Sequence, residues 1–335
     1  MTSTTAIPLA DPVLADRLTA RLALVEERLR DAVTHADPLA DDASRHLVNA
    51  GGKRLRPLLT LLTAELGDGA RREVVDAAVV VELTHLATLY HDDVMDSAPV
   101  RRGAPAAHEV WGNSVAILTG DLLFARASTT VAGLGPQAVR IQAATFERLC
   151  LGQLHETVGP RDGENPVAHY LQVLADKTGS LIATSARFGA MFAGCAPDVV
   201  STVTAFGERI GVAFQLADDV IDLTSEGAVT GKTPGTDLRE GVPTMPALLL
   251  RARAASASGT SQDRALVELL DGDLSGDDAL GEAVAALRED AAVEQTRSRA
   301  VALAHEAIAE LAPLPAGPVK DALVSFADAL VDRAS

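Results

Sequence analysis

A long segment without glycine or proline most constrains the fold of this chain. Residues 71–98 contain neither residue type, and at about 1.5 Å per residue they can form a helix roughly 40 Å long. Residues 74–89 are apolar on nearly every side, since only Asp76 and Glu82 carry a formal charge there. A helix that is apolar all round is a buried helix. The segment therefore predicts a central helix enclosed by other helices.

The composition favours the same class of fold. Aromatic residues make up 3% of the 335 residues, and alanine, leucine and valine dominate, which favours helix packed on helix over a sheet structure. Apolar residues at helical spacing begin near Pro12, at Leu14, Leu18, Leu22, Val25 and Leu29. Further helices are expected over residues 116–133, 136–157, 167–193 and 198–225.

The domain organisation follows from the absence of a long linker. Residues 254–281 mix serine, glycine and aspartate with one apolar run, and we expect them to form a surface excursion. No stretch is long and polar enough to divide the chain. We therefore expect an all-α bundle in one domain of residues 1–335, with the motifs in residues 50–250.

Charge and cysteine usage exclude several classes of protein. The net charge of −17 argues against binding to nucleic acid or to an anionic membrane. No uninterrupted apolar run reaches about 18 residues, and no signal peptide is evident. We therefore expect a cytoplasmic protein without a transmembrane segment. Cys150 and Cys195 match no metal or disulfide spacing, so two buried thiols are expected.

Two copies of Asp-Asp-x-x-Asp lie on apolar helical stretches. One occupies residues 92–96, at the end of the long buried helix, and the other occupies residues 218–222. The outer aspartates of each copy share a helix face, and such like charges destabilise a helix by about 0.2–0.5 kcal/mol. A solvated acidic helix end would explain one copy. Two copies at the same spacing favour a bound cation, and oxygen-only ligands indicate Mg²⁺.

Basic residues accompany these acidic clusters. They occur in Gly51-Gly52-Lys53-Arg54-Leu55-Arg56, Arg101-Arg102-Gly103, Lys177-Thr178 and Gly231-Lys232-Thr233. Arginine makes planar, bidentate contacts with phosphate, and lysine acts as a point charge. Each pair alone would be ordinary solvated surface. Together with the carboxylates they predict a site for a metal-bound polyphosphate.

The order of these motifs resembles the trans-type polyprenyl diphosphate synthases. The resemblance runs from about Ala50 to Leu250 and rests on the motifs Gly-Gly-Lys-Arg-Leu-Arg-Pro, His-Asp-Asp-Val-Met-Asp, Arg-Arg-Gly, Gln-Leu-Ala-Asp-Asp-Val-Ile-Asp and Gly-Lys-Thr. It implies a bundle of antiparallel helices around a deep central cavity, with the two aspartate clusters facing each other across its mouth. A homodimer is expected.

The resemblance assigns a role to each motif residue. Asp92, Asp96 and Asp218 would hold Mg²⁺, with support from Asp93 and Asp222, and about three ions would be bound per active site together with substrate. Asp219 joins these five aspartates in the expected catalytic set. The allylic diphosphate would be held by Arg101, Lys177, Thr178, Gln215 and Lys232. Isopentenyl diphosphate would be held by Lys53, Arg56, His85 and Arg102. His85 lies seven residues before Asp92, on nearly the same helix face, although a lone histidine in a buried helix is commonly a core residue.

The implied reaction is ionisation, condensation and elimination. Mg²⁺ neutralises the departing diphosphate as a Lewis acid, and the double bond of isopentenyl diphosphate attacks the allylic cation. Released diphosphate then takes up the proton that is lost. Six aspartates and two lysines, Lys177 and Lys232, are the expected catalytic set.

Product length is expected to depend on the helix below the first cluster. Ala87 and Thr88 are small, and Thr88 lies about 6 Å below Asp92. Short-chain relatives tend to carry a bulky aromatic residue at this level, so the sequence favours a long-chain product for a quinone side chain. Another helix could instead supply the cavity floor, with Met191, Phe192 and Phe146 as candidates.

Four alternatives stay open on the sequence. One is a short-chain synthase that stops at farnesyl or geranylgeranyl diphosphate. A terpene cyclase normally lacks the Gly-Gly-Lys-Arg segment and the second aspartate cluster, and a non-catalytic subunit of a heteromeric synthase typically loses one cluster. A metal-storage bundle would need Glu-x-x-His on two helices, and only Glu82 with His85 fits that spacing.

Overall fold

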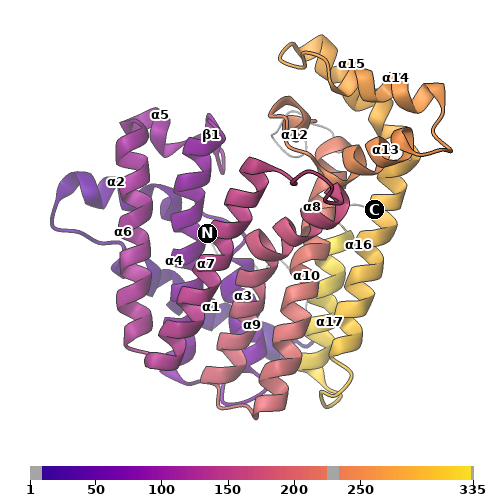
Figure 1. The fold of residues 1–335 in the computed structure, drawn as a ribbon. Coiled ribbons are helices and arrows are strands. Elements are labelled where there is room, and N and C mark those ends of the chain that lie inside the picture. The colour runs from indigo at the N-terminus through magenta and orange to yellow at the C-terminus, as the bar shows by residue number, and fades with distance from the viewer. Residues whose placement is uncertain (1–9, 225–233, 333–335) are drawn as a thin grey trace. The chain divides into compact units, whose positions relative to one another are not determined.

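The computed structural model describes residues 10–224 and 234–332, and these are almost entirely helical (Figure 1). Within them, the only strands are β1 (Val100–Arg101) and β2 (Ala104–Pro105), which pair antiparallel. The predicted all-α fold is confirmed.

The chain divides into two compact units. The first comprises residues 1–149, 180–208 and 308–326, and the second comprises residues 150–179, 209–307 and 327–335. Four helices contribute residues to both units: α7 (Pro136–Val158), α10 (Pro197–Thr224), α16 (Ala291–Glu310) and α17 (Pro318–Val331). The expected single functional domain stays a prediction.

The first unit is built around the predicted central helix. Its complete helices are α1 (Pro12–Ala32), α2 (Pro38–Asn49), α3 (Leu55–Ala64), α4 (Arg72–Met95), α5 (Ala107–Trp111), α6 (Asn113–Ala132) and α9 (Ser180–Phe192). Helix α4 packs against α1, α3, α6 and α9, and α6 runs alongside it in Figure 1. Most of α4 is buried, and so are the five apolar residues expected to form the inner face of α1.

The second unit contains shorter helices. These are α8 (Pro166–Leu174), η1 (Ala175–Gly179), α12 (Thr236–Arg239), α13 (Met245–Ala255), α14 (Ser261–Leu270) and α15 (Asp277–Arg288). Residues 254–281 lie mostly at the surface, as expected, but much of this stretch is helical, because α14 and the start of α15 occupy it. Helix α14 begins with a capping box in which Thr260 and Asp263 satisfy each other's backbone donors, and this signal was present in the sequence.

Two further expectations need correction. The single helix expected over residues 167–193 is interrupted by the π-helical turn η1. The thiols are not both buried, since Cys150 is exposed and Cys195 is partly exposed. Cys150 lies on a face of α7 that is exposed within the described residues, because Leu154, four residues later on the same face, is 55% exposed.

Two helices are long and apolar enough to cross a membrane by length and composition alone. In α4, 72% of the most apolar 18-residue stretch is buried inside the protein, and in α6 the corresponding share is 33%. Core helices of soluble proteins pass the same test. The burial of α4 identifies it as a core helix, while the exposed apolar face of α6 calls for another explanation.

Candidate active site

The first aspartate cluster ends α4, and its three members have different environments. Asp92 is half-buried, Asp93 is fully buried and Asp96, the last residue of the turn, is exposed. Asp93 Oδ1 accepts a hydrogen bond from Arg101 Nε at 2.5 Å, and its Oδ2 is buried without a hydrogen-bond partner. Burial raises the pKa of Asp93, although the Arg101 charge opposes this. Asp92 and Asp96 are thus the more exposed members of the cluster.

The backbone after α4 returns Arg101 to this cluster. The Ala98 N–H donates to Asp93 O at 3.0 Å, and Ser97 has a positive φ of 50°. The tight hairpin that follows has Arg102 at φ 54°. Arg101, which is predicted to bind a diphosphate, therefore forms an ion pair with Asp93 in the structure.

Arg102 lies over the glycine pair that precedes α3. Gly51 and Gly52 have φ values of 84° and 141°, which favour glycine. A Cβ atom on Gly52 would lie 2.8 Å from Arg102 Cζ. The Arg102 guanidinium donates to Leu47 O at 3.2 Å and to Gly51 O. The Gly-Gly pair therefore makes room for a guanidinium group, which the sequence motif alone did not reveal.

A buried carboxylate that the sequence analysis assigned to no site holds this basic group together. Glu82 on α4 is 1% exposed, and its Oε1 accepts from Arg54 Nη1 at 2.8 Å and lies 3.9 Å from Arg102 Nη2. Arg54 also donates to Glu26 at 2.5 Å. Arg54 is therefore a structural cation. The signal was available, because Glu82 is one of only two formal charges within residues 74–89.

The residues predicted to hold isopentenyl diphosphate all belong to the first unit. Arg56 has a buried Nε without a hydrogen-bond partner, and burial lowers its pKa to about 10. Burial, followed by the charges of Arg56 and Arg102, lowers the pKa of His85 well below its usual value. Lys53 is exposed. Arg56, Arg102 and the neutral His85 thus form a basic cluster that Glu82 balances only in part.

The second aspartate cluster lies in the second unit and repeats the pattern of the first. Asp218 and Asp222 are half-buried, whereas Asp219 is 3% exposed. Tyr170 OH donates to Asp219 Oδ1 and Oδ2 at 2.9 and 2.8 Å, and Met245 N donates to Oδ2 at 3.0 Å. Burial raises the pKa of Asp219 well above its usual value. In both clusters the middle aspartate points into the protein and the outer two do not.

The π turn η1 presents two more predicted residues. Lys177 Nζ donates to Glu156 Oε2 at 2.5 Å, and Thr178 Oγ1 donates to Gln215 Oε1 at 3.4 Å. Gly152 allows the turn to approach α7, because a Cβ there would lie 2.7 Å from Lys177 N. Isolated π turns are frequent at functional sites. No pattern in the sequence predicted the π turn η1 or the contact of Glu156 with Lys177.

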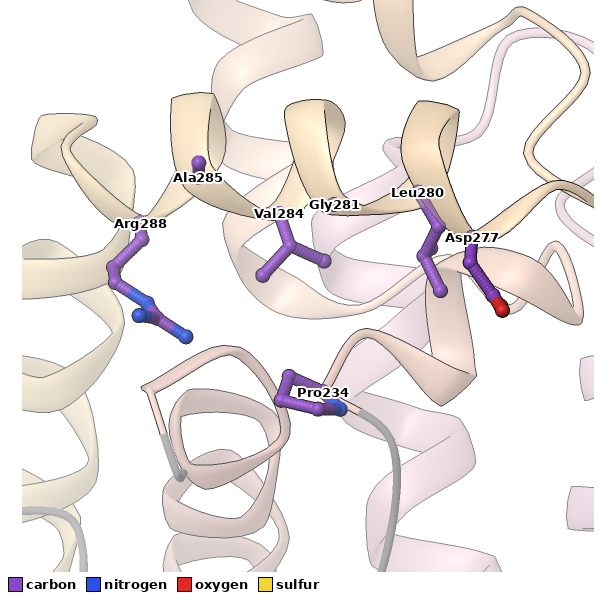
Figure 2. Close-up of a pocket in the computed structure, with 7 residues that line it drawn as sticks. All are labelled: Pro234, Asp277, Leu280, Gly281, Val284, Ala285 and Arg288. Carbon is purple, nitrogen blue, oxygen red and sulfur yellow. The ribbon is translucent and has the colours of Figure 1, made fainter. Parts of the chain in front are cut away.

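The C-terminal end of α10 is fastened by α15. Arg288 donates from Nε and Nη2 to Leu223 O at 2.8 and 2.5 Å, and Gly235 N donates to Asp222 O at 2.9 Å. A pocket of about 330 Å³ under α15 is lined by Arg288, Pro234, Asp277 and apolar residues. Figure 2 shows these side chains as sticks. Lys232 lies outside the described residues.

The predicted chain-length residues lie on α4 below the first cluster. Ala87 is fully buried and Thr88 is half-buried, with its hydroxyl donating to His85 O at 2.8 Å. A Cβ on Gly120 of α6 would lie 3.0 Å from Ala87 O. The two helices are therefore closely packed at this level.

The donor set fits a Mg²⁺ ion that shares its coordination with a substrate. Among residues 10–224 and 234–332, no three His, Cys, Asp or Glu side chains are arranged to hold an ion by themselves. Mg²⁺ commonly binds through one or two carboxylates, several waters and substrate phosphates. The accessible outer carboxylates of each cluster match that type of site.

The chain is similar in sequence to known prenyl-transferring enzymes. The polyprenyl synthetase family model matches residues 37–287. Nonaprenyl diphosphate synthase from Mycobacterium tuberculosis is 44% identical over 98% of this chain and 96% of its own length. Dimethylallyltranstransferase from the same organism is 36% identical over 96% of this chain and 97% of its own length.

Solved structures agree. Geranylgeranyl pyrophosphate synthase from Corynebacterium glutamicum, complexed with calcium and isoprenyl diphosphate, has a TM-score of 0.86 at 41% identity, covering 98% of this chain and 99% of that one. Polyprenyl synthase from Caulobacter crescentus CB15, in the same kind of complex, has a TM-score of 0.88 at 32% identity, covering 96% and 97%.

Proposed function

Because this chain belongs to the polyprenyl synthetase family and is therefore a prenyltransferase, we propose that it uses Mg²⁺ and makes a long-chain trans-polyprenyl diphosphate. The family expected from the motifs is confirmed. The reaction joins isopentenyl diphosphate head to tail to an allylic diphosphate.

The observation that carries the proposal is the partly balanced basic cluster of Arg56, His85 and Arg102. Its Arg56 Nε is buried without a hydrogen-bond partner, and leaving a buried donor to a charged group unsatisfied is costly. The lowered pKa of Arg56, about 10, has the same origin, because burial disfavours the charged form by more than the nearby Glu82 charge compensates. A diphosphate would supply both the acceptor and the charge, so we assign isopentenyl diphosphate to this cluster, with Lys53 at its exposed edge.

We assign the allylic diphosphate to Lys177, Thr178, Gln215, Lys232 and Arg101. Gln215, Asp218 and Asp222 share one face of α10, and Thr178 contacts Gln215. Mg²⁺ held by Asp92, Asp96 and Asp218, with Asp222 in support, would neutralise the leaving diphosphate. Two solved relatives are complexed with calcium and isoprenyl diphosphate, which supports the use of a divalent cation.

The residues of the chain contribute positioning and charge. Arg56 and Arg102 hold isopentenyl diphosphate by its phosphates, and His85, kept neutral by burial and by the neighbouring cations, can donate one hydrogen bond without adding charge. Lys177 and Gln215 orient the allylic diphosphate for ionisation. Carbon–carbon bond formation then needs no nucleophilic side chain, and we assign proton removal to the released diphosphate.

A long product is supported by the small residues below the first cluster. Ala87, Thr84, Val81 and Val80 are buried on α4 without an aromatic ring among them, and a 44% identical relative is named as a nonaprenyl diphosphate synthase. The alternative floor candidate Phe146 stacks on Phe124 of α6, with ring centroids 3.8 Å apart. A 41% identical structure named as a geranylgeranyl pyrophosphate synthase keeps a shorter product as the second candidate.

We further propose a homodimer that works in the cytoplasm. The apolar residues Ile117 and Leu118 on α6 are 42% and 61% exposed, and α6 is only one-third buried in its most apolar window. A second copy of the chain would cover this face. Light scattering should show a dimer that Leu118→Glu weakens, whereas Leu24→Glu, at a 48% exposed leucine of α1, should leave it intact.

The central test is a product assay. Purified protein is incubated with labelled isopentenyl diphosphate and dimethylallyl, geranyl or farnesyl diphosphate, with Mg²⁺ or with chelator. We expect metal-dependent products longer than geranylgeranyl diphosphate after dephosphorylation and chromatography. Products that stop at farnesyl or geranylgeranyl diphosphate would establish the short-chain alternative, and cyclic hydrocarbons would establish a cyclase.

A further inference from the structure

We propose that Tyr170 is a positioning residue for the second aspartate cluster, acting through Asp219 to fix the orientation in which α10 presents Asp218 and Asp222. This inference rests on the proposed function and adds to it a residue outside every motif of the sequence. Asp219 becomes a buried anchor and not a metal ligand.

The first support is the hydrogen bonding of Asp219. Tyr170 OH lies 2.9 and 2.8 Å from the two carboxylate oxygens, and Met245 N lies 3.0 Å from Oδ2. Tyr170 and Asp219 are 6% and 3% exposed. A carboxylate with both oxygens occupied in the interior has little capacity left for a solvated cation.

The second support is that Asp219 joins three helices of the same unit. Tyr170 comes from α8, Asp219 from α10 and Met245 is the first residue of α13. Thr244, the residue before α13, makes no side-chain cap, and its hydroxyl is buried without a partner. The carboxylate of Asp219 therefore caps α13 in place of Thr244, at the helix end where negative charge is favourable.

The third support is the geometry of α10. At about 100° per residue, Asp218 and Asp222 are about 40° apart around α10, whereas Asp219 is about 100° from Asp218 and about 60° from Asp222. Asp219 therefore lies on the buried flank of the face that carries the two half-buried outer aspartates. Fixing Asp219 to α8 and α13 fixes the rotation of α10 about its axis. Loss of that constraint would move both outer carboxylates together.

The test compares the only two tyrosines of the chain. Tyr90 is fully buried, and its hydroxyl donates to Ala43 O at 2.5 Å and accepts from Leu47 N at 3.2 Å. Tyr170→Phe and Tyr90→Phe each remove one buried hydroxyl from an aromatic ring. Only the first removes a contact to an aspartate of a cluster.

Two readouts separate positioning from general stability. Calorimetry measures the binding of inorganic diphosphate in the presence of Mg²⁺, and kinetics measure kcat and the KM for each substrate. In Tyr170→Phe we expect about ten-fold weaker Mg²⁺–diphosphate binding, as for the loss of a hydrogen bond to a charged group. The KM for the allylic substrate should rise, and that for isopentenyl diphosphate should stay unchanged. Tyr90→Phe should match wild type in both.

Asp219→Asn provides a second variant of the same shape, which keeps an acceptor for Tyr170 but places an amide near the Met245 N–H. It should show the same pattern as Tyr170→Phe. The proposal fails if Tyr170→Phe binds Mg²⁺–diphosphate as wild type does, or if both tyrosine variants change equally. It also fails if Asp219→Asn abolishes binding while Tyr170→Phe has no effect, since Asp219 would then be a ligand. Absence of prenyl transfer by wild type would instead refute the proposed function.

Discussion

Glu82→Gln should destabilise the protein far more than a matched change at Glu26. Both carboxylates bind Arg54, through contacts of 2.8 and 2.5 Å. The side chain of Glu82 is 2% exposed and that of Glu26 is 20% exposed. Removing one partner of a buried ion pair costs about 3–5 kcal/mol, whereas a solvent-accessible pair contributes about 1 kcal/mol or less.

The corresponding shifts in melting temperature can be estimated from chain length. An unfolding entropy of about 2.1 cal/mol/K per residue over 335 residues gives about 0.7 kcal/mol/K. Glu82→Gln keeps one acceptor for Arg54, so we take the lower end, about 3 kcal/mol, which corresponds to a decrease of about 4 °C. Glu26→Gln should lower the melting temperature by about 1 °C.

Differential scanning calorimetry at pH 7 measures both variants beside wild type, and circular dichroism checks that helix content is retained. The pair of changes is isosteric, so packing differences are small and the comparison reports mainly on charge. Equal melting temperatures for the two variants, or a Glu82→Gln variant as stable as wild type, would refute the view that the buried carboxylate holds the arginines in place.

Three further predictions concern the reaction. Asp92→Ala and Asp218→Ala should each lower kcat by several orders of magnitude with an intact helical spectrum, because each removes an accessible oxygen ligand; near-normal turnover in either would disprove the metal assignment. Arg56→Lys should chiefly raise the KM for isopentenyl diphosphate, since lysine cannot replace the buried Nε–H. Steady-state kinetics with both substrates varied measure this, and a change in the KM for the allylic primer alone would mean that the two subsites are exchanged. Ala87→Phe should shift the product to about three to four isoprene units, as measured by mass spectrometry, and an unchanged product length would place the cavity floor on another helix, with Phe146 the first residue to replace.

Some helices could be predicted from the sequence and others could not. The buried central helix and the inner face of α1 were predicted correctly, because the period of apolar residues directly reflects which side of a helix is buried. The helices after residue 254 were missed, although Thr260 and Asp263 form a recognisable capping box. The π turn at Lys177 could not be predicted, since apolar spacing does not distinguish one inserted residue from a regular helix.

The candidate site divides in a similar way. The sequence identified the aspartates and the basic motifs because residue type and spacing determine which metal and which anion a helix face can bind. The family resemblance gave the metal to Asp92, Asp96 and Asp218 without a physical reason for the choice. In the structure, Asp93 and Asp219 are buried, with Arg101 and Tyr170 as partners.

The amino-acid sequence by itself determined that this chain is helical and that it carries two carboxylate clusters with basic companions, and the order of these motifs gave the resemblance to a prenyltransferase family. Local spacing is sufficient for the helices and the clusters, because each depends on residues within one or two helical turns. Only the tertiary structure decided that Glu82 orders Arg54 and Arg102, and that Tyr170 and Met245 meet at Asp219. Those contacts join residues 20 to 49 positions apart, and whether a charge is buried or solvated depends on what the fold packs against it.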